Sequence, residues 1–159
     1  MSAARPVIVL DTNIIVRATA RIASPSNQIV DACLRGQFRL LLSRPVLVEY
    51  RNVLSYEEVI AMNPEIAGKP LKLLLERLRA RSEYFRTVAP KFEFDRDPDD
   101  EKFIELAIVG NASHIITNDR DLLSLKDQHT HAAKRFRQRL PTTKIVTPPE
   151  FLASFSAQK

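Results

Sequence analysis

The chain has 159 residues, of which 45% are hydrophobic and 27% charged, a composition that is ordinary for a globular protein and excludes disordered and fibrous classes. The formal net charge of +5 favours an anionic partner. Cys33 is the only cysteine, which excludes an internal disulfide and a thiolate metal site, and we expect it in the core. No apolar run approaches the roughly 18 residues that cross a bilayer and no signal-peptide pattern is present, so we expect a cytoplasmic protein with no membrane partner.

The first half of the chain predicts two buried strands among helices. Residues 6–10 form an apolar run rich in β-branched residues, and residues 38–42 predict a second strand. Ser24 and Pro25 predict the start of a helix that runs to about Gly36. Helical patterns follow from Pro45 to a break at Asn63-Pro64, and from about Pro70 to Thr87, where the exposed side is basic.

The second half repeats this alternation after an acidic, proline-interrupted loop at residues 93–101. A helix is predicted from Asp99 or Asp100 to Gly110 or Asn111. The remaining predictions are a buried strand at 114–117, a short helix through Leu125, a strand at 144–147 and a closing helix from Pro148. Strands that alternate with helices predict an α/β fold with a mainly parallel sheet, and we expect residues 1–159 to form a single domain.

Acidic residues recur where a parallel sheet places its functional sites. Asp11 and Asp119 each follow a predicted strand, and such strand ends meet at one edge of the sheet. Asp100 at a helix start and Glu49 on another helix can reach the same place. Carboxylates at close range repel one another unless a cation neutralises them, so a convergent acid set without a basic partner predicts a metal site. All-oxygen ligation favours Mg²⁺ or Mn²⁺ over zinc.

Several side chains near these acids are candidates for orienting the metal-binding carboxylates without binding the metal themselves. Asn13 and Thr117 flank the strand ends, and Asp121 and Glu105 lie close to the acids in sequence. Asn13 and Thr117 could instead satisfy local backbone groups. Asp97, Asp99 and Asp100 are partly redundant because one of them is expected to cap the following helix, and only Asp100 is assigned to the metal.

A basic run near the carboxyl end is a candidate for contact with nucleic acid. It joins four cations to the ring of Phe136, which could stack on a base. An exposed helix face is the plainer interpretation of such a run. The four cations are Lys134, Arg135, Arg137 and Arg139.

These motifs together resemble the PIN-domain family. Val9-Leu10-Asp11-Thr12-Asn13 resembles the family's opening, and the segments around Glu49, around Asp97 to Ala107 and from Ile115 to Leu123 resemble those that carry its other acids. The tail from Ile145 to Leu152 is similar to the VapC-like toxin components of toxin–antitoxin systems. The resemblance implies a three-layer α/β/α fold and Mg²⁺- or Mn²⁺-dependent cleavage of RNA by Asp11, Glu49, Asp100 and Asp119. An antitoxin and a second copy of the chain are the candidate protein partners.

One departure from the family pattern and one alternative function remain. The stretch from Lys126 to Thr143 is longer and more basic than the usual connection. The alternative is a non-catalytic RNA-binding or protein-interaction module that keeps the fold. A phosphatase of the haloacid-dehalogenase type is disfavoured because it needs an aspartate where this chain has Asn13.

Overall fold

The computed structural model describes residues 4–126 and 129–157, and within them five parallel strands form one sheet in the order β3-β2-β1-β4-β5. The strands are β1 (Val7–Leu10), β2 (Arg39–Ser43), β3 (Glu83–Phe85), β4 (His114–Ile116) and β5 (Lys144–Val146). β1 and β4 pair in the centre, with Leu10 opposite Ile116. The predicted α/β class with a parallel sheet is confirmed.

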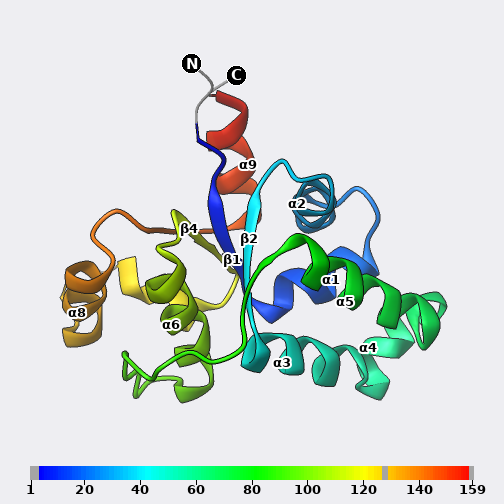
Figure 1. Ribbon diagram of the computed structural model, residues 1–159, viewed down its shortest axis with the longest axis horizontal. Helices are drawn as coiled ribbons and strands as arrows, with labels where there is room; N and C mark the ends of the chain where they lie inside the picture. Colours follow the sequence, from blue (N-terminus) through cyan, green and yellow to red (C-terminus); the bar gives the residue numbers. More distant parts are fainter. Residues whose placement is uncertain (1–3, 127–128, 158–159) are drawn as a thin grey trace.

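Helices cover both faces of this sheet and complete a three-layer α/β/α arrangement (Figure 1). On one face α6 (Glu101–Gly110) packs against β1, β2 and β4. On the other side α1 (Thr12–Ala20) packs on α2 (Pro25–Leu34), which also contacts α5 (Lys69–Arg81) and α9 (Pro148–Ala157). The remaining helices are α3 (Arg44–Leu54), α4 (Glu57–Met62), α7 (Arg120–Leu123) and α8 (His131–Arg139), with short 3-10 turns η1 (Pro64–Ile66), η2 (Pro98–Asp100) and η3 (Ser124–Lys126). None of the helices in the described ranges is long and apolar enough to span a membrane.

Local sequence explains several element boundaries. Ser24 caps α2 by accepting a hydrogen bond from the Asn27 amide at 3.1 Å, and Pro25 occupies the first turn as predicted. Ser43 caps α3 in the same way. Asn111 ends α6 in a left-handed conformation with φ 50°, which asparagine tolerates better than most residues. Cys33 is buried in the core, where desolvation raises its thiol pKa to about 12.

The structure corrects the helix and strand predictions in four places. Thr12–Ala20 forms α1, where no helix was predicted. The helical stretch from Pro45 is broken at Ser55, which separates α3 from α4. The helix predicted to reach Thr87 ends at Arg81, because the next residues pair with β2 as strand β3, which includes Phe85. α2 ends at Leu34, before Gly36, which has φ 78°.

Candidate metal centre

Asp11 and Asp119 follow the two central strands, and one threonine connects them. The Asp11 amide continues the β1–β4 ladder by donating to the Ile116 carbonyl at 3.1 Å. The Thr117 hydroxyl donates to Asp11 Oδ2 at 2.7 Å and accepts from the Asp119 amide at 2.9 Å. Asp11 and Thr117 are buried. The geometry supports the expectation that Thr117 orients a neighbouring carboxylate.

Two further carboxylates, those of Asp97 and Asp100, gather beside this pair of strand ends. One ligand atom from each of Asp97, Asp100 and Asp119 lies within 4.8 Å of the other two. Asp97 and Asp100 bracket η2, and Asp97 also caps this turn by accepting from the Asp99 amide at 3.2 Å. Asp100 is only 6% exposed, and its Oδ2 atom is buried without a hydrogen-bond partner. We call Asp11, Asp97, Asp100 and Asp119 the acid cluster.

The acid cluster is electrostatically strained without a counterion. Burial raises the pKa of Asp100 to about 9, and the hydrogen bond with Asp119 and the charges of Asp11, Asp119 and Asp97 add to this shift. Burial also raises the pKa of Asp11 to about 6, with smaller contributions from Asp119 and Glu49. Within residues 4–126 and 129–157, no lysine, arginine or histidine forms an ion pair with any carboxylate of the cluster.

This donor set fits a divalent cation. It consists of closely spaced carboxylate oxygens, one of them buried and unpartnered, and a cation there would compensate both the repulsion and the lost hydration. Oxygen ligands of this kind suit hard cations.

Glu49 lies beside the cluster but has partners of its own. Its Oε1 atom forms an ion pair with Lys102 Nζ at 2.7 Å, and its Oε2 atom accepts a hydrogen bond from the Thr12 hydroxyl. Its charge contributes to the raised pKa of Asp11, so the two carboxylates are close enough to interact. Glu49 therefore differs from Asp11, Asp100 and Asp119, which form no ion pair with any residue that the structure describes.

The predicted outer residues have different environments. Asn13 is exposed on α1, with no hydrogen bond from its side chain to any described residue. Asp121 forms an ion pair with Arg96 at 2.6 Å, and its amide donates to Asp119 Oδ1 at 2.8 Å. Glu105 accepts from the Lys91 amide at 2.5 Å and so holds the loop that precedes η2.

Sequence reasoning left Asp97 out of the metal set, whereas the structure places it in the acid cluster. The signal was present in the Asp97-Pro98 pair, which marks Asp97 as a cap of the next turn. The residue that caps η2 lies beside Asp100, because Asp100 is the last residue of this turn. A capping role and a ligand role are therefore compatible for Asp97.

The basic run in α8 is partly committed to packing. Arg135 lies 5.1 Å from the Phe92 ring centre and donates to the Glu93 carbonyl at 2.5 Å. Phe136 is only 3% exposed and packs edge-on against Phe92, so the suggestion that its ring stacks on a base is wrong. The side chains of Lys134, Arg137 and Arg139 are exposed.

Comparison with known proteins identifies the family of the chain. The PIN-domain family model matches residues 7–121, which include every member of the acid cluster and Glu49, and the chain belongs to this family. PIN domains are generally metal-dependent nucleases. The chain is also 28% identical over 155 residues to the uncharacterized protein MJ1680 of Methanocaldococcus jannaschii, an alignment that covers 93% of this chain and 90% of the relative. The basic run in α8 lies outside the segment that the family model matches.

Proposed function

We propose that this protein is a ribonuclease that cleaves RNA phosphodiester bonds at the acid cluster with Mg²⁺ or Mn²⁺. The single observation that carries the proposal is the convergence of Asp97, Asp100 and Asp119, of which Asp100 has a buried oxygen without a hydrogen-bond partner. The net charge of +5 supports a polyanionic substrate.

In this proposal the carboxylates of the acid cluster hold the metal, and Thr117 positions two of them. Asp11, Asp100 and Asp119 hold the cation, and Asp97 adds a further oxygen. A bound divalent cation supplies Lewis-acid polarisation of the phosphate and neutralises charge during in-line displacement. Thr117 fixes the orientation of Asp11 and the backbone of Asp119, so that the ligands are placed before substrate arrives.

We further propose a role as the toxin of a toxin–antitoxin pair, acting in the cytoplasm. This step rests on the resemblance of the tail from Ile145 to Leu152 to VapC-like proteins. An antitoxin is the partner that this role requires, and a homodimer is a compatible assembly.

A second candidate is a PIN-fold module that binds RNA or protein without cleavage. It is favoured by the ion pair between Lys102 and Glu49, which occupies one of the expected ligands. Such a module would retain RNA and leave it intact.

Cleavage of single-stranded RNA in Mn²⁺, Mg²⁺ or EDTA separates these functions, with single-stranded DNA as a substrate control. We expect cleavage of RNA in either metal, none in EDTA, and none by Asp11→Asn, which removes a ligand charge with little change of volume. The matched control is Asp31→Asn, because this exposed carboxylate on α2 lies outside the acid cluster and pairs with Arg35. Activity that persists in EDTA, or wild-type activity of Asp11→Asn, contradicts the metal mechanism, and retention of uncut RNA supports the second candidate.

A further inference from the structure

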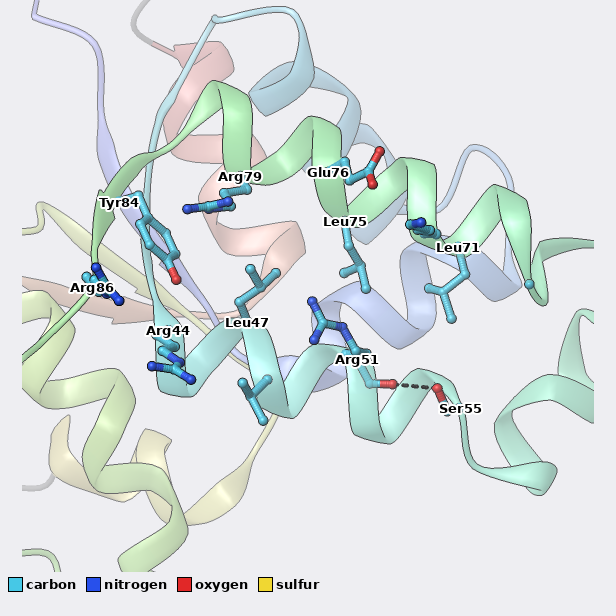
Figure 2. A pocket seen from close by; sticks show the side chains of 13 residues that line it. Arg44, Leu47, Arg51, Ser55, Leu71, Leu75, Glu76, Arg79, Tyr84 and Arg86 are labelled. Atoms are coloured by element: carbon cyan, nitrogen blue, oxygen red, sulfur yellow. Dashed lines mark hydrogen bonds between the residues drawn. The ribbon is translucent and has the colours of Figure 1, made fainter.

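A groove of about 860 Å³ lies between α3 and α5 and carries an excess of positive charge. Among the described residues that line it, five are cations and one, Glu76, is an acid. The cations are Arg44, Arg51, Lys72, Arg79 and Arg86. We call this feature the α3–α5 groove (Figure 2).

The five cations are exposed and are not neutralised by the protein. Within residues 4–126 and 129–157 none of them forms an ion pair with a carboxylate. The guanidinium of Arg79 lies 4.6 Å from the Tyr84 ring centre. Unpaired positive charges around one groove make its electrostatic potential positive, and a positive potential favours an anionic occupant.

The groove opens at the same edge of the sheet as the acid cluster. Arg44 directly follows the end of β2, and Arg86 directly follows the end of β3. Asp11 and Thr117 follow the ends of β1 and β4, and all these strands are parallel. Figure 2 shows Arg44, Tyr84 and Arg86 together at one end of the groove.

Helix α3 forms the wall between the two features. Arg44, Val48, Arg51 and Ser55 recur at helical spacing and face the groove, whereas Glu49 lies one position further around the helix and contacts Thr12 and Lys102 beside the acid cluster. Arg44 and Arg51 are separated by seven residues, or about 10 Å along the helix. An occupant of the groove would therefore lie alongside the metal centre.

The lining is mixed in a way that suits a single nucleic-acid strand. The basic rim can contact phosphates, while exposed Val48 and half-buried Tyr84 offer apolar and aromatic surface to bases above a floor of buried leucines. A second copy of the chain is disfavoured, because a symmetric interface through this groove would bring its cations against their own counterparts.

We propose that the α3–α5 groove binds the sugar-phosphate backbone of single-stranded RNA that flanks the bond cut at the acid cluster. The proposal rests on the proposed nuclease function for its substrate. The groove offsets the repulsion that a polyanion meets at a cluster of carboxylates, so it raises affinity without taking part in the cleavage step.

The test measures binding separately from cleavage. Fluorescence anisotropy of a labelled 12-nucleotide single-stranded RNA is recorded in EDTA for the wild type, for Arg51→Glu/Lys72→Glu, and for Arg77→Glu/Arg81→Glu. The last pair is the matched control, because Arg77 and Arg81 are exposed on α5 and do not line the groove.

We expect the groove variant to bind RNA at least tenfold more weakly than the control variant. The slope of log affinity against log salt should fall by about 1.4, at roughly 0.7 for each lost phosphate contact on a single strand. In Mn²⁺ the groove variant should raise KM for the 12-nucleotide RNA and leave kcat within about twofold.

Equal affinities of the two double variants would overturn the proposal, as would an unchanged salt slope. Two further results would also overturn it. The first is that light scattering detects a dimer for the wild type and that the groove variant loses this dimer. The second is that the groove of the wild-type protein binds polyglutamate but not RNA. RNA binding that depends on the groove, without any cleavage in Mn²⁺, would leave the groove assigned and refute the nuclease function instead.

Discussion

Thr117 joins the two central strand ends through a single hydroxyl group. It donates to Asp11 and accepts from the Asp119 amide, and it is fully buried. Because the hydroxyl serves two groups that flank the proposed metal, its geometry determines how both carboxylates are presented. We therefore propose that Thr117 is a positioning residue rather than a ligand.

Thr117→Val is expected to weaken metal binding and cleavage by about 10- to 100-fold, the usual effect of losing a group that orients a ligand. It should also lower the free energy of unfolding by about 1–3 kcal/mol, because valine leaves the part-buried Asp119 amide without its acceptor. The measurements are the Mn²⁺ concentration for half-maximal cleavage and urea unfolding. Thr117→Ser should restore the metal requirement, and a serine variant as defective as valine would contradict the hydrogen-bonding role.

At the scale of elements, the close approach of α6 to β2 sets the position of the acidic turn. Gly110 lies at the end of α6, and a Cβ atom built there would collide with the Leu41 side chain, lying 2.8 Å from its Cδ2 atom. Leu41 is fully buried on β2, so it has little room to move. The same helix begins next to Asp100, so its seating against the sheet also places the acid cluster.

Gly110→Ala should destabilise the protein by about 1–3 kcal/mol, because overpacking of the core outweighs the roughly 1 kcal/mol that alanine adds to helix propensity. Urea unfolding measures this change. In the double variant Gly110→Ala/Leu41→Ala the cost of the glycine substitution should largely disappear, because the colliding methyl groups are gone. A Gly110→Ala protein as stable as the wild type would show that the close approach is not structurally required.

At the scale of the whole molecule, opposite charges are gathered at one edge of the sheet. In the acid cluster, Asp11 and Asp119 follow β1 and β4, and the turn η2 brings Asp97 and Asp100 beside them. In the α3–α5 groove, Arg44 and Arg86 follow β2 and β3, and the other cations lie on α3 and α5. The net charge of +5 therefore conceals a strongly acidic site. Protons or a cation must balance this site, which makes the stability of the whole fold depend on pH and metal.

In EDTA, the free energy of unfolding should decrease as pH rises from about 4 to about 9. The pKa values of Asp11 and Asp100 are raised by burial from 3.8 to about 6 and about 9, so the folded protein keeps protons that the unfolded chain releases. Thermal unfolding followed by circular dichroism measures the trend. Saturating Mn²⁺ should raise Tm more at pH 8 than at pH 5, because metal replaces those protons.

Asp100→Asn isolates the contribution of that carboxyl group. The variant should show a shallower pH dependence in EDTA and a smaller Mn²⁺-induced rise in Tm than the wild type. Asp99→Asn is the matched control, since Asp99 is the exposed neighbour in the same turn. Identical pH profiles for Asp100→Asn and the wild type would refute the burial of an ionisable, strained carboxylate at this position.

The amino-acid sequence by itself determined the features that depend on local periodicity and capping. The apolar run before Asp11 predicts β1, Ser24-Pro25 predicts the start of α2, and the acids at strand ends predict a metal site, because buried strands and helix caps have residue requirements that neighbours along the chain satisfy. The parallel sheet follows from the alternation of such elements. Among the four predicted acids, Asp100 and Asp119 lie close together, and Asp11 is linked to Asp119 through Thr117.

Only the tertiary structure decided features that depend on partners distant in sequence. Glu83–Phe85 is a strand because β2 supplies its hydrogen bonds, and Thr12–Ala20 is helical although its β-branched residues favour a strand, because its buried face packs on α2. The pairing of Glu49 with Lys102, the packing of Arg135 on Phe92 and the entry of Asp97 into the acid cluster are likewise contacts across the fold. Such contacts have no periodic signature in the sequence, because they arise only when separate elements are brought to the same edge of the sheet.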